Sequence, residues 1–381
     1  MPDSGRWTNG FLDEMREVGD PRAGKAAAAM LESGHVKELS QLLRSLAHVD
    51  QAAPEGLPAE VAAYFAETAS LPGDVDRARI RRAQTFFQTN GLKISACLFC
   101  ASLPSSYAAA KGAQVLAITG RLDSDARRRI FETGQFLMDV MAVGGLDERG
   151  TGIRTAQRVR LMHGGIRHLI CKRNESAKLW DATWGVPINQ EDLAGTMLAF
   201  ALVPADPLRR LNVEVSDAEA SDYLYAWKMI GLLMGVKEEM LPNDLDDAAA
   251  LVAAIKRRHY RPSPEGRELT AALVTLLDDL TPTQWADRFI PMFIRHLIGD
   301  DVAKIIALPT SAPAAVRWFP RPLLRVLSRT GVYMDKSLEM ARLAEPFGRE
   351  FLQAVFDFQR RGVRATFDIP TELADEWNLV R

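Results

Sequence analysis

Cysteine is scarce in this chain, and no second histidine or cysteine stands at ligand spacing from His35, His48, His259 or His296. The three cysteines are Cys97, Cys100 and Cys171, too few for a disulfide framework, so we expect a reducing compartment. Cys97 and Cys100 form a single CxxC, for which two small buried residues one helical turn apart are as good an explanation as a redox or metal site. A zinc protease motif is also absent. The sequence therefore favours neither a disulfide scaffold nor a protein-only metal centre.

An excess of charge and a long apolar run are absent as well. The 47 basic and 49 acidic residues give a net charge of -2, which provides no general attraction to nucleic acid. The best apolar run, AAALVAAI at 248–255, is far shorter than the ~20 residues that span a bilayer. The first twenty residues lack the continuous apolar core of a secretory signal, so we expect a cytoplasmic protein.

Alternating strand patterns are rare, and helical periodicity dominates. The sequence predicts an all-α fold in which a helical core is wrapped by additional N- and C-terminal helices. We expect three parts, with a break at Pro72-Gly73-Asp74: an N-terminal helical extension at 1–74, the core at 75–310 and C-terminal helices packed on the core at 311–381.

Several element boundaries can be predicted from local signals. A helix should run from a cap at Asp123 or Ser124 to about Met141. Another should start at Asn189, with acidic residues in its first turn. One helix should end near Asn90 and a separate one should follow from about Lys93.

One histidine, in the stretch RVRLMHGGIRHLIC at 158–171, lies on an apolar helical face. His163 shares a stripe with Val159, Met162, Ile166 and Ile170, so its side chain should point inward. Gly164 and Gly165 each weaken the helix by about 1 kcal/mol, a cost that suits a need for room beside the histidine. A lone inward histidine is either a core residue bonded to a carbonyl or a ligand, and as a ligand it fits heme iron, since a porphyrin supplies four nitrogens itself.

Further polar residues stand near this histidine or in the preceding helix. Arg160 and Arg167 lie within roughly 60° of His163 around the helix, so each is a candidate for a heme propionate or for ordinary exposure. Arg129 and Thr133 are four residues apart on one face and either form a polar corner in a dry pocket or belong to a solvated surface.

A set of short motifs in a fixed order resembles the MpaB and latex-clearing-protein oxygenases over about 80 to 310. The motifs are SLPSSYAAAKGAQVLAITGRL at 102–122, RRRIFET at 127–133, VRLMHGGIR at 159–167, WGVPINQEDLAGTMLAF at 184–200 and WKMIGLLMGVKEEMLP at 227–242.

The resemblance implies a globin-like helical core at 75–310 that holds non-covalent heme b, and oxidative cleavage by O₂ of a carbon-carbon double bond in an isoprenoid or other unsaturated substrate. Carried over by position, His163 is the proximal iron ligand and Gly164 adjoins the cofactor. Arg129 and Thr133 are the distal polar pair beside dioxygen, where a guanidinium can stabilise negative charge and a hydroxyl can orient the ligand.

The chain departs from the rubber-cleaving branch of that family at two positions. Glu132 stands where that branch has a lysine before the threonine, so a lysine-ligated closed state is not available. Ala113 stands at the spacing of an upstream acid. Glu132 is either a substitute acid or base or the partner of Arg129 at i, i+3. With no export signal, we expect a small terpenoid or other unsaturated lipid as substrate.

Two other classes of function compete with the oxygenase. The chain is alternatively a heme-binding sensor or carrier without chemistry, or a metal-free helical lipid-binding protein in which His163 is a core residue. The segment 316–331 combines arginines four apart with aromatics, which is typical either of weak peripheral membrane contact or of a helix packed on the core. The oligomeric state cannot be predicted from the sequence.

Overall fold

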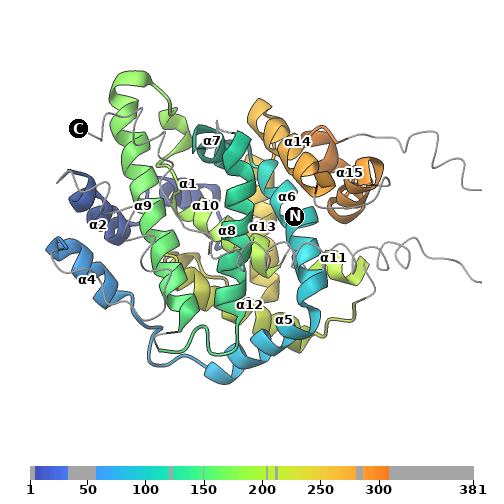
Figure 1. Ribbon diagram of the computed structural model, residues 1–381, viewed down its shortest axis with the longest axis horizontal. Helices are drawn as coiled ribbons and strands as arrows, with labels where there is room; N and C mark the ends of the chain where they lie inside the picture. Colours follow the sequence, from blue (N-terminus) through green and yellow to red (C-terminus); the bar gives the residue numbers. More distant parts are fainter. Residues whose placement is uncertain are drawn as a thin grey trace, which may run out of the picture.

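The computed structural model describes residues 5–32, 57–119, 123–148, 150–202, 205–210, 213–279 and 286–308. Within these ranges the regular elements are helices, and the only extended pairing is an isolated bridge between Ala109 and Tyr260 (Figure 1). The all-α prediction is confirmed. A globin-like arrangement of the core stays a prediction, and the predicted helices at 311–381 and the segment 316–331 lie outside the described residues.

The helices follow one another with short connections. In the first half of the chain they are α1 (Asn9–Arg16), α2 (Pro21–Glu32), α4 (Ala59–Glu67), α5 (Arg77–Cys97), η1 (Leu98–Ser102), α6 (Leu103–Tyr107), α7 (Ala110–Thr119), α8 (Asp123–Met141) and α9 (Thr151–Ala177). In the second half they are η2 (Ala182–Trp184), α10 (Gln190–Ala201), α11 (Ala205–Arg210), α12 (Asp217–Leu233), η3 (Glu238–Met240), α13 (Leu245–His259), α14 (Pro264–Asp279), α15 (Ala286–Ile298) and α16 (Asp300–Ile305).

Side-chain caps fix several helix starts. Asn189 accepts a hydrogen bond from the backbone N–H of Asp192, and Ser216 forms a reciprocal capping box with Glu219. The predicted start of α10 and the predicted bounds of α8 are therefore confirmed. The predicted break between Asn90 and Lys93 is wrong, because α5 is continuous through this stretch.

The chain leaves regular α-helical geometry just after α5. Residues 98–102 form η1, a π-helical turn. Pro104 follows within α6 and has no N–H to donate to the carbonyl four residues earlier, which removes one α-helical bond from this turn. The turn is buried, and it belongs to the wall of the cavity described below.

The long helix α9 lies between two layers. It packs against α8 on one side and against α2 and α4 on the other, and α5 pairs with α12 (Figure 1). The α2 contact depends on small residues, since Ala23, Ala26 and Ala27 meet Leu161 and Leu169 of α9 in one apolar cluster. The helices α14 and α15 lie at the other end of the molecule in this view.

Buried hydrogen bonds connect the N-terminal part of the chain to α9. Arg160 of α9 donates two hydrogen bonds to the carboxylate of Asp20, at 2.6 and 3.0 Å. The hydroxyl of Tyr64 donates to the carbonyl of Gln157 at 2.6 Å. The N-terminal helices therefore share a buried interface with α9, while the division at residue 74 stays a prediction.

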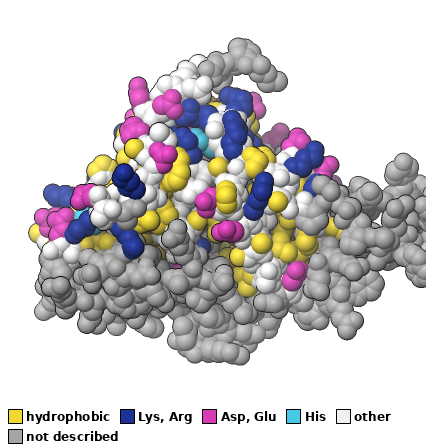
Figure 2. All heavy atoms as spheres, turned by 90° about the horizontal axis from the view of Figure 1, so that it is seen from above, with side chains coloured by type: hydrophobic (Ala, Val, Ile, Leu, Met, Phe, Trp, Pro, Cys, Tyr) yellow, Lys and Arg dark blue, Asp and Glu magenta, His cyan; other side chains and the backbone are white. Residues whose placement is uncertain are grey.

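The surface carries both signs of charge. In Figure 2, lysine, arginine, aspartate and glutamate side chains are interspersed with apolar ones on the face shown, in line with the small net charge. In the described part of the chain, every helix is too short or too polar to span a membrane.

Candidate active site

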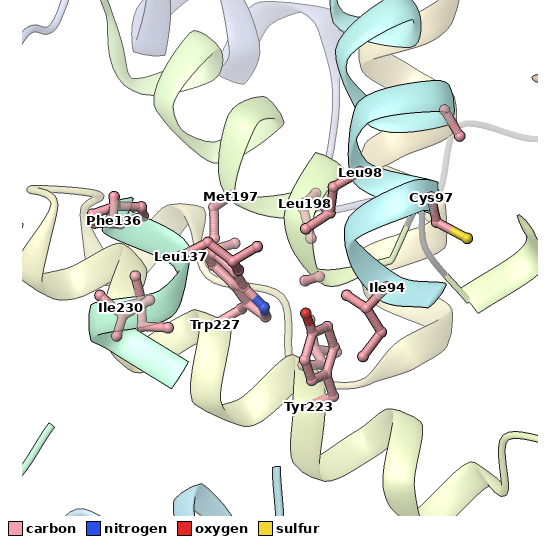
Figure 3. Close-up of a cluster of buried hydrophobic side chains, with 14 of the residues drawn as sticks. Ile94, Cys97, Leu98, Phe136, Leu137, Met197, Leu198, Tyr223, Trp227 and Ile230 are labelled. Atoms are coloured by element: carbon pink, nitrogen blue, oxygen red, sulfur yellow. The ribbon is translucent and has the colours of Figure 1, made fainter. Parts of the chain in front are cut away.

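A largely apolar cavity of about 430 Å³ lies among η1, α6 to α10 and α12 to α14. Part of its wall is a cluster of buried side chains (Figure 3), in which Leu98, Phe136, Leu137, Met197 and Trp227 come from four elements, η1, α8, α10 and α12. Its volume is within the usual range for small-molecule pockets. Such a wall excludes water and strengthens any electrostatic interaction inside the cavity.

The predicted stripe of α9 forms one side of this cavity. His163 borders it together with Val159, Met162 and Ile166. Burial and the nearby positive charge of Arg167 lower the pKa of His163 from 6.5 to about 4, so the imidazole is neutral at physiological pH. Its Nδ1 is buried and has no hydrogen-bond partner within the described residues. A core histidine bonded to a carbonyl is therefore not what the described contacts show.

The predicted polar residues of α8 border the same cavity as His163. Arg129 donates from Nη1 to the carbonyl of Leu116 and to the hydroxyl of Thr119, both at 3.1 Å. Thr133 donates its hydroxyl hydrogen to the carbonyl of Arg129 at 2.8 Å, so this hydroxyl presents only lone pairs to the cavity. Glu132 is buried, with 6% of its surface exposed. The cavity thus holds a cation, a hydroxyl and a carboxyl group at its α8 wall.

The other predicted residues of α9 have different surroundings. Arg160 is bonded to Asp20 and to the carbonyl of Leu233, and it does not border the cavity. Arg167 does not border the cavity either: it donates to the carbonyls of Pro187 and Ile188, at 2.8 and 2.6 Å, and its buried Nη1 has no partner within the described residues.

Gly164 faces α2 rather than the cavity. A Cβ added there would lie 2.5 Å from the carbonyl oxygen of Ala23, which is a severe clash. This glycine therefore allows α2 and α9 to approach closely, and the expectation that it leaves room for a flat ligand is not what its contacts show. A contact of Gly164 with a cofactor stays a prediction.

A second polar group at the cavity was not predicted. Glu191 and Asp192 of α10 and His259 at the end of α13 also border it. Glu191 accepts hydrogen bonds from Arg16 at 3.2 Å and from Arg258 at 2.8 Å, and it lies 2.8 Å from His259 Nε2. The sequence indicates Glu191 and Asp192 only as the acidic first turn of a helix. Glu191 and His259 lie 68 positions apart, so no local sequence pattern indicates that they form a pair.

The ion pairs around Glu191 set its ionisation state. Burial raises its pKa, but the hydrogen bond from His259 and the contacts with Arg258 and Arg16 outweigh burial and lower the pKa to about 2. Glu191 is therefore a carboxylate at neutral pH.

A family model described as "ER-bound oxygenase mpaB/B'/Rubber oxygenase, catalytic domain" matches residues 94–330, more than half of the chain. The chain belongs to this family. The predicted resemblance is thereby confirmed, and the matched range contains each of the candidate cavity residues on α8 and α9.

Two relatives agree with this assignment. The rubber oxygenase of Streptomyces sp. (strain K30) is 26% identical over 294 residues, which is 76% of this chain and 71% of that protein. A solved structure of latex clearing protein LCP in the closed state matches with a TM-score of 0.71 at 26% identity, covering 87% of this chain and 90% of that one.

Proposed function

We propose that this protein is a heme b-dependent oxygenase that uses O₂ to cleave a carbon-carbon double bond in an apolar unsaturated substrate. The observation that carries the proposal is the neutral imidazole of His163, whose buried Nδ1 has no hydrogen-bond partner within the described residues, at an apolar cavity that Arg129 also borders. Membership of an oxygenase family supports the reaction class.

The residues at the cavity fit heme on three counts. Histidine ligates a metal in its neutral form, which is the form that the lowered pKa of His163 provides. The described residues contain no cluster of three or more metal-ligating side chains, so a macrocycle that brings four nitrogens suits a lone histidine. The lining of the cavity is largely apolar, which suits the flat faces of a porphyrin.

Heme bound to His163 would supply the iron on which O₂ is held and activated. The chain's own residues would then act around it. Arg129 brings a positive charge to a water-poor cavity, where it stabilises negative charge as the reaction develops. Thr133 offers lone pairs at the same wall. Glu132 either moves a proton or pairs with Arg129.

The double bond is the decisive element in a test of this proposal. Oxygen uptake by the heme-loaded protein should be measured with farnesene and, as the matched control, with its saturated counterpart farnesane. We expect uptake only with farnesene, accompanied by carbonyl products. Heme binding without uptake on any unsaturated probe would instead support a sensor or carrier, and a protein that binds no heme would support the metal-free lipid-binding alternative.

A further inference from the structure

The polar end of the cavity, formed by Glu191, Asp192 and His259, is not used by the proposed chemistry. Glu191 and His259 are 1% and 5% exposed, so both are more buried than Asp192, whose side chain is 19% exposed. Buried polar groups are costly unless they are paired, and charged ones especially so. A cavity that took only hydrocarbon would gain nothing from this end.

The carboxylate of Glu191 orients the ring of His259. An ionised carboxylate only accepts hydrogen bonds, and Glu191 lies 2.8 Å from Nε2 of His259. Nε2 therefore carries a hydrogen and is engaged with Glu191, which leaves Nδ1 as the ring nitrogen that a ligand can reach. Within the described residues this buried Nδ1 has no partner.

The charges that face the cavity at this end are mainly acceptors. Asp192 borders it with a carboxylate that already accepts from Arg16 at 3.0 Å, while Arg16 and Arg258 themselves do not border it. A carboxylate has about four lone-pair sites, so Asp192 can accept further bonds. Lys256 is an exposed cation at the same end, with Nζ 5.8 Å from the ring centroid of Tyr260. Two buried or partly buried carboxylates disfavour an anionic ligand and favour a neutral donor.

Helix α7 relates this end to the predicted catalytic wall. A Cβ on Gly112 would lie 4.0 Å from the carboxylate of Asp192, and Arg129 is bonded to Leu116 and Thr119 further along the same helix. Seven residues of helix rise about 10 Å. The polar end and Arg129 are therefore separated by about the length of a short unsaturated chain.

We infer that the polar end of the cavity binds the hydroxyl group of an unsaturated alcohol, whose chain runs along the apolar wall toward Arg129. The hydroxyl donates its hydrogen to Nδ1 of His259, beside the carboxylate of Asp192. This inference rests on the proposed function for the fate of the double bond, but not for the binding itself. It makes the substrate class a prenyl-type alcohol rather than a hydrocarbon.

Calorimetric titration of the purified, heme-loaded full chain with three matched probes tests the inference. The probes are farnesol, farnesyl methyl ether, which lacks the donor, and farnesoic acid, which is anionic at pH 7.5. We expect farnesol to bind about tenfold more tightly than the ether, the difference that one buried hydrogen bond makes, and farnesoate to bind more weakly than farnesol. Equal binding of alcohol and ether, or tightest binding of the acid, would overturn the inference.

A variant locates the effect within the cavity. His259→Phe keeps an aromatic ring but removes Nδ1, so the preference for alcohol over ether should fall to about one. The matched control is His168→Phe on α9, which does not border the cavity and should keep the wild-type preference. A folded His259→Phe protein that keeps the tenfold preference would contradict the assignment. Should this variant not fold, the three wild-type affinities still decide the question.

The inference and the proposed function can fail separately. Selective farnesol binding without any oxygen uptake would leave the alcohol site standing and remove the oxygenase. Oxygen uptake with farnesol and its ether, at equal affinity, would leave the oxygenase standing and remove the alcohol site.

Discussion

The two polar ends of one cavity are built in opposite ways. At the first end, His163 lies among apolar neighbours, and its Nδ1 has no hydrogen-bond partner in the described structure. At the second end, Glu191 is held by Arg16, Arg258 and His259 together. Helices α1, α10 and α13 meet at this second carboxylate.

This difference separates a side chain with a buried polar atom left over from a carboxylate that several partners hold. The buried Nδ1 of His163 lowers stability, because it has lost water and gained no partner within the described residues. Such a cost is usual at sites that bind a ligand. The ion-paired carboxylate instead belongs to the support of the fold. Substitutions at the two ends should therefore affect different properties.

The largest effect is expected at the second end. Glu191→Gln removes the charge that pairs with two arginines, so the free energy of unfolding should fall by about 3 to 5 kcal/mol. Urea unfolding followed by circular dichroism at pH 7 measures this change. A decrease of less than about 1 kcal/mol in the free energy of unfolding would show that the ion pairs of Glu191 do not stabilise the fold, and the two ends of the cavity would then not differ as described.

A substitution of Arg129 should lower activity rather than stability. Arg129→Ala should lower kcat by about 10²- to 10³-fold while heme content stays at the wild-type level, because the lost charge acts on the reaction rather than on the fold. Steady-state oxygen uptake and the heme-to-protein ratio together measure this. Unchanged turnover would remove Arg129 from the proposed chemistry.

The two ends should also respond to acid in different pH windows. His163 is harder to protonate when folded, so the unfolded heme-free chain binds more protons between pH 6.5 and about 4, and stability falls as the pH falls through that window, by about 3 kcal/mol in all. Glu191 contributes stability that is present above its ordinary pKa of 4.5 and is lost as the pH falls toward 2.

Unfolding free energies of the heme-free protein across this range test the sign. Subtracting the curve of His163→Phe from that of the wild type should isolate the upper window. A difference curve that is flat between pH 6.5 and 4 would contradict the burial of His163 that lowers its pKa.

The smallest expected effect concerns Gly164, on the face of α9 that packs against α2 rather than on the face that borders the cavity. Gly164→Ala should cost about 1 to 3 kcal/mol, because the new Cβ meets the Ala23 carbonyl at 2.5 Å. Gly195→Ala, on the cavity side of α10, is the matched control: its Cβ would lie 3.4 Å from Ile255, so stability should stay level or rise slightly. Thermal unfolding of both variants measures this, and equal melting temperatures would argue against the packing role of Gly164.

The sequence was informative where a signal is local. The stripe of His163, the bounds of α8 and the Asn189 cap all depend on residues within a few turns, and the structure confirms the helices that they predict. The roles of Gly164 and Arg160 depend on Ala23 and Asp20, about 140 residues away, and helical spacing says nothing about such partners. The Glu191–His259 pair was missed for the same reason.

An absorption spectrum of the purified protein, before and after dithionite, shows directly whether His163 holds heme iron. We expect a Soret band that is largely lost in His163→Ala and kept in the matched His168→Ala variant, whose ring does not border the cavity. A folded wild-type protein that stays colourless after expression with ample heme, or a His163→Ala variant with an undiminished Soret band, would contradict heme ligation by His163.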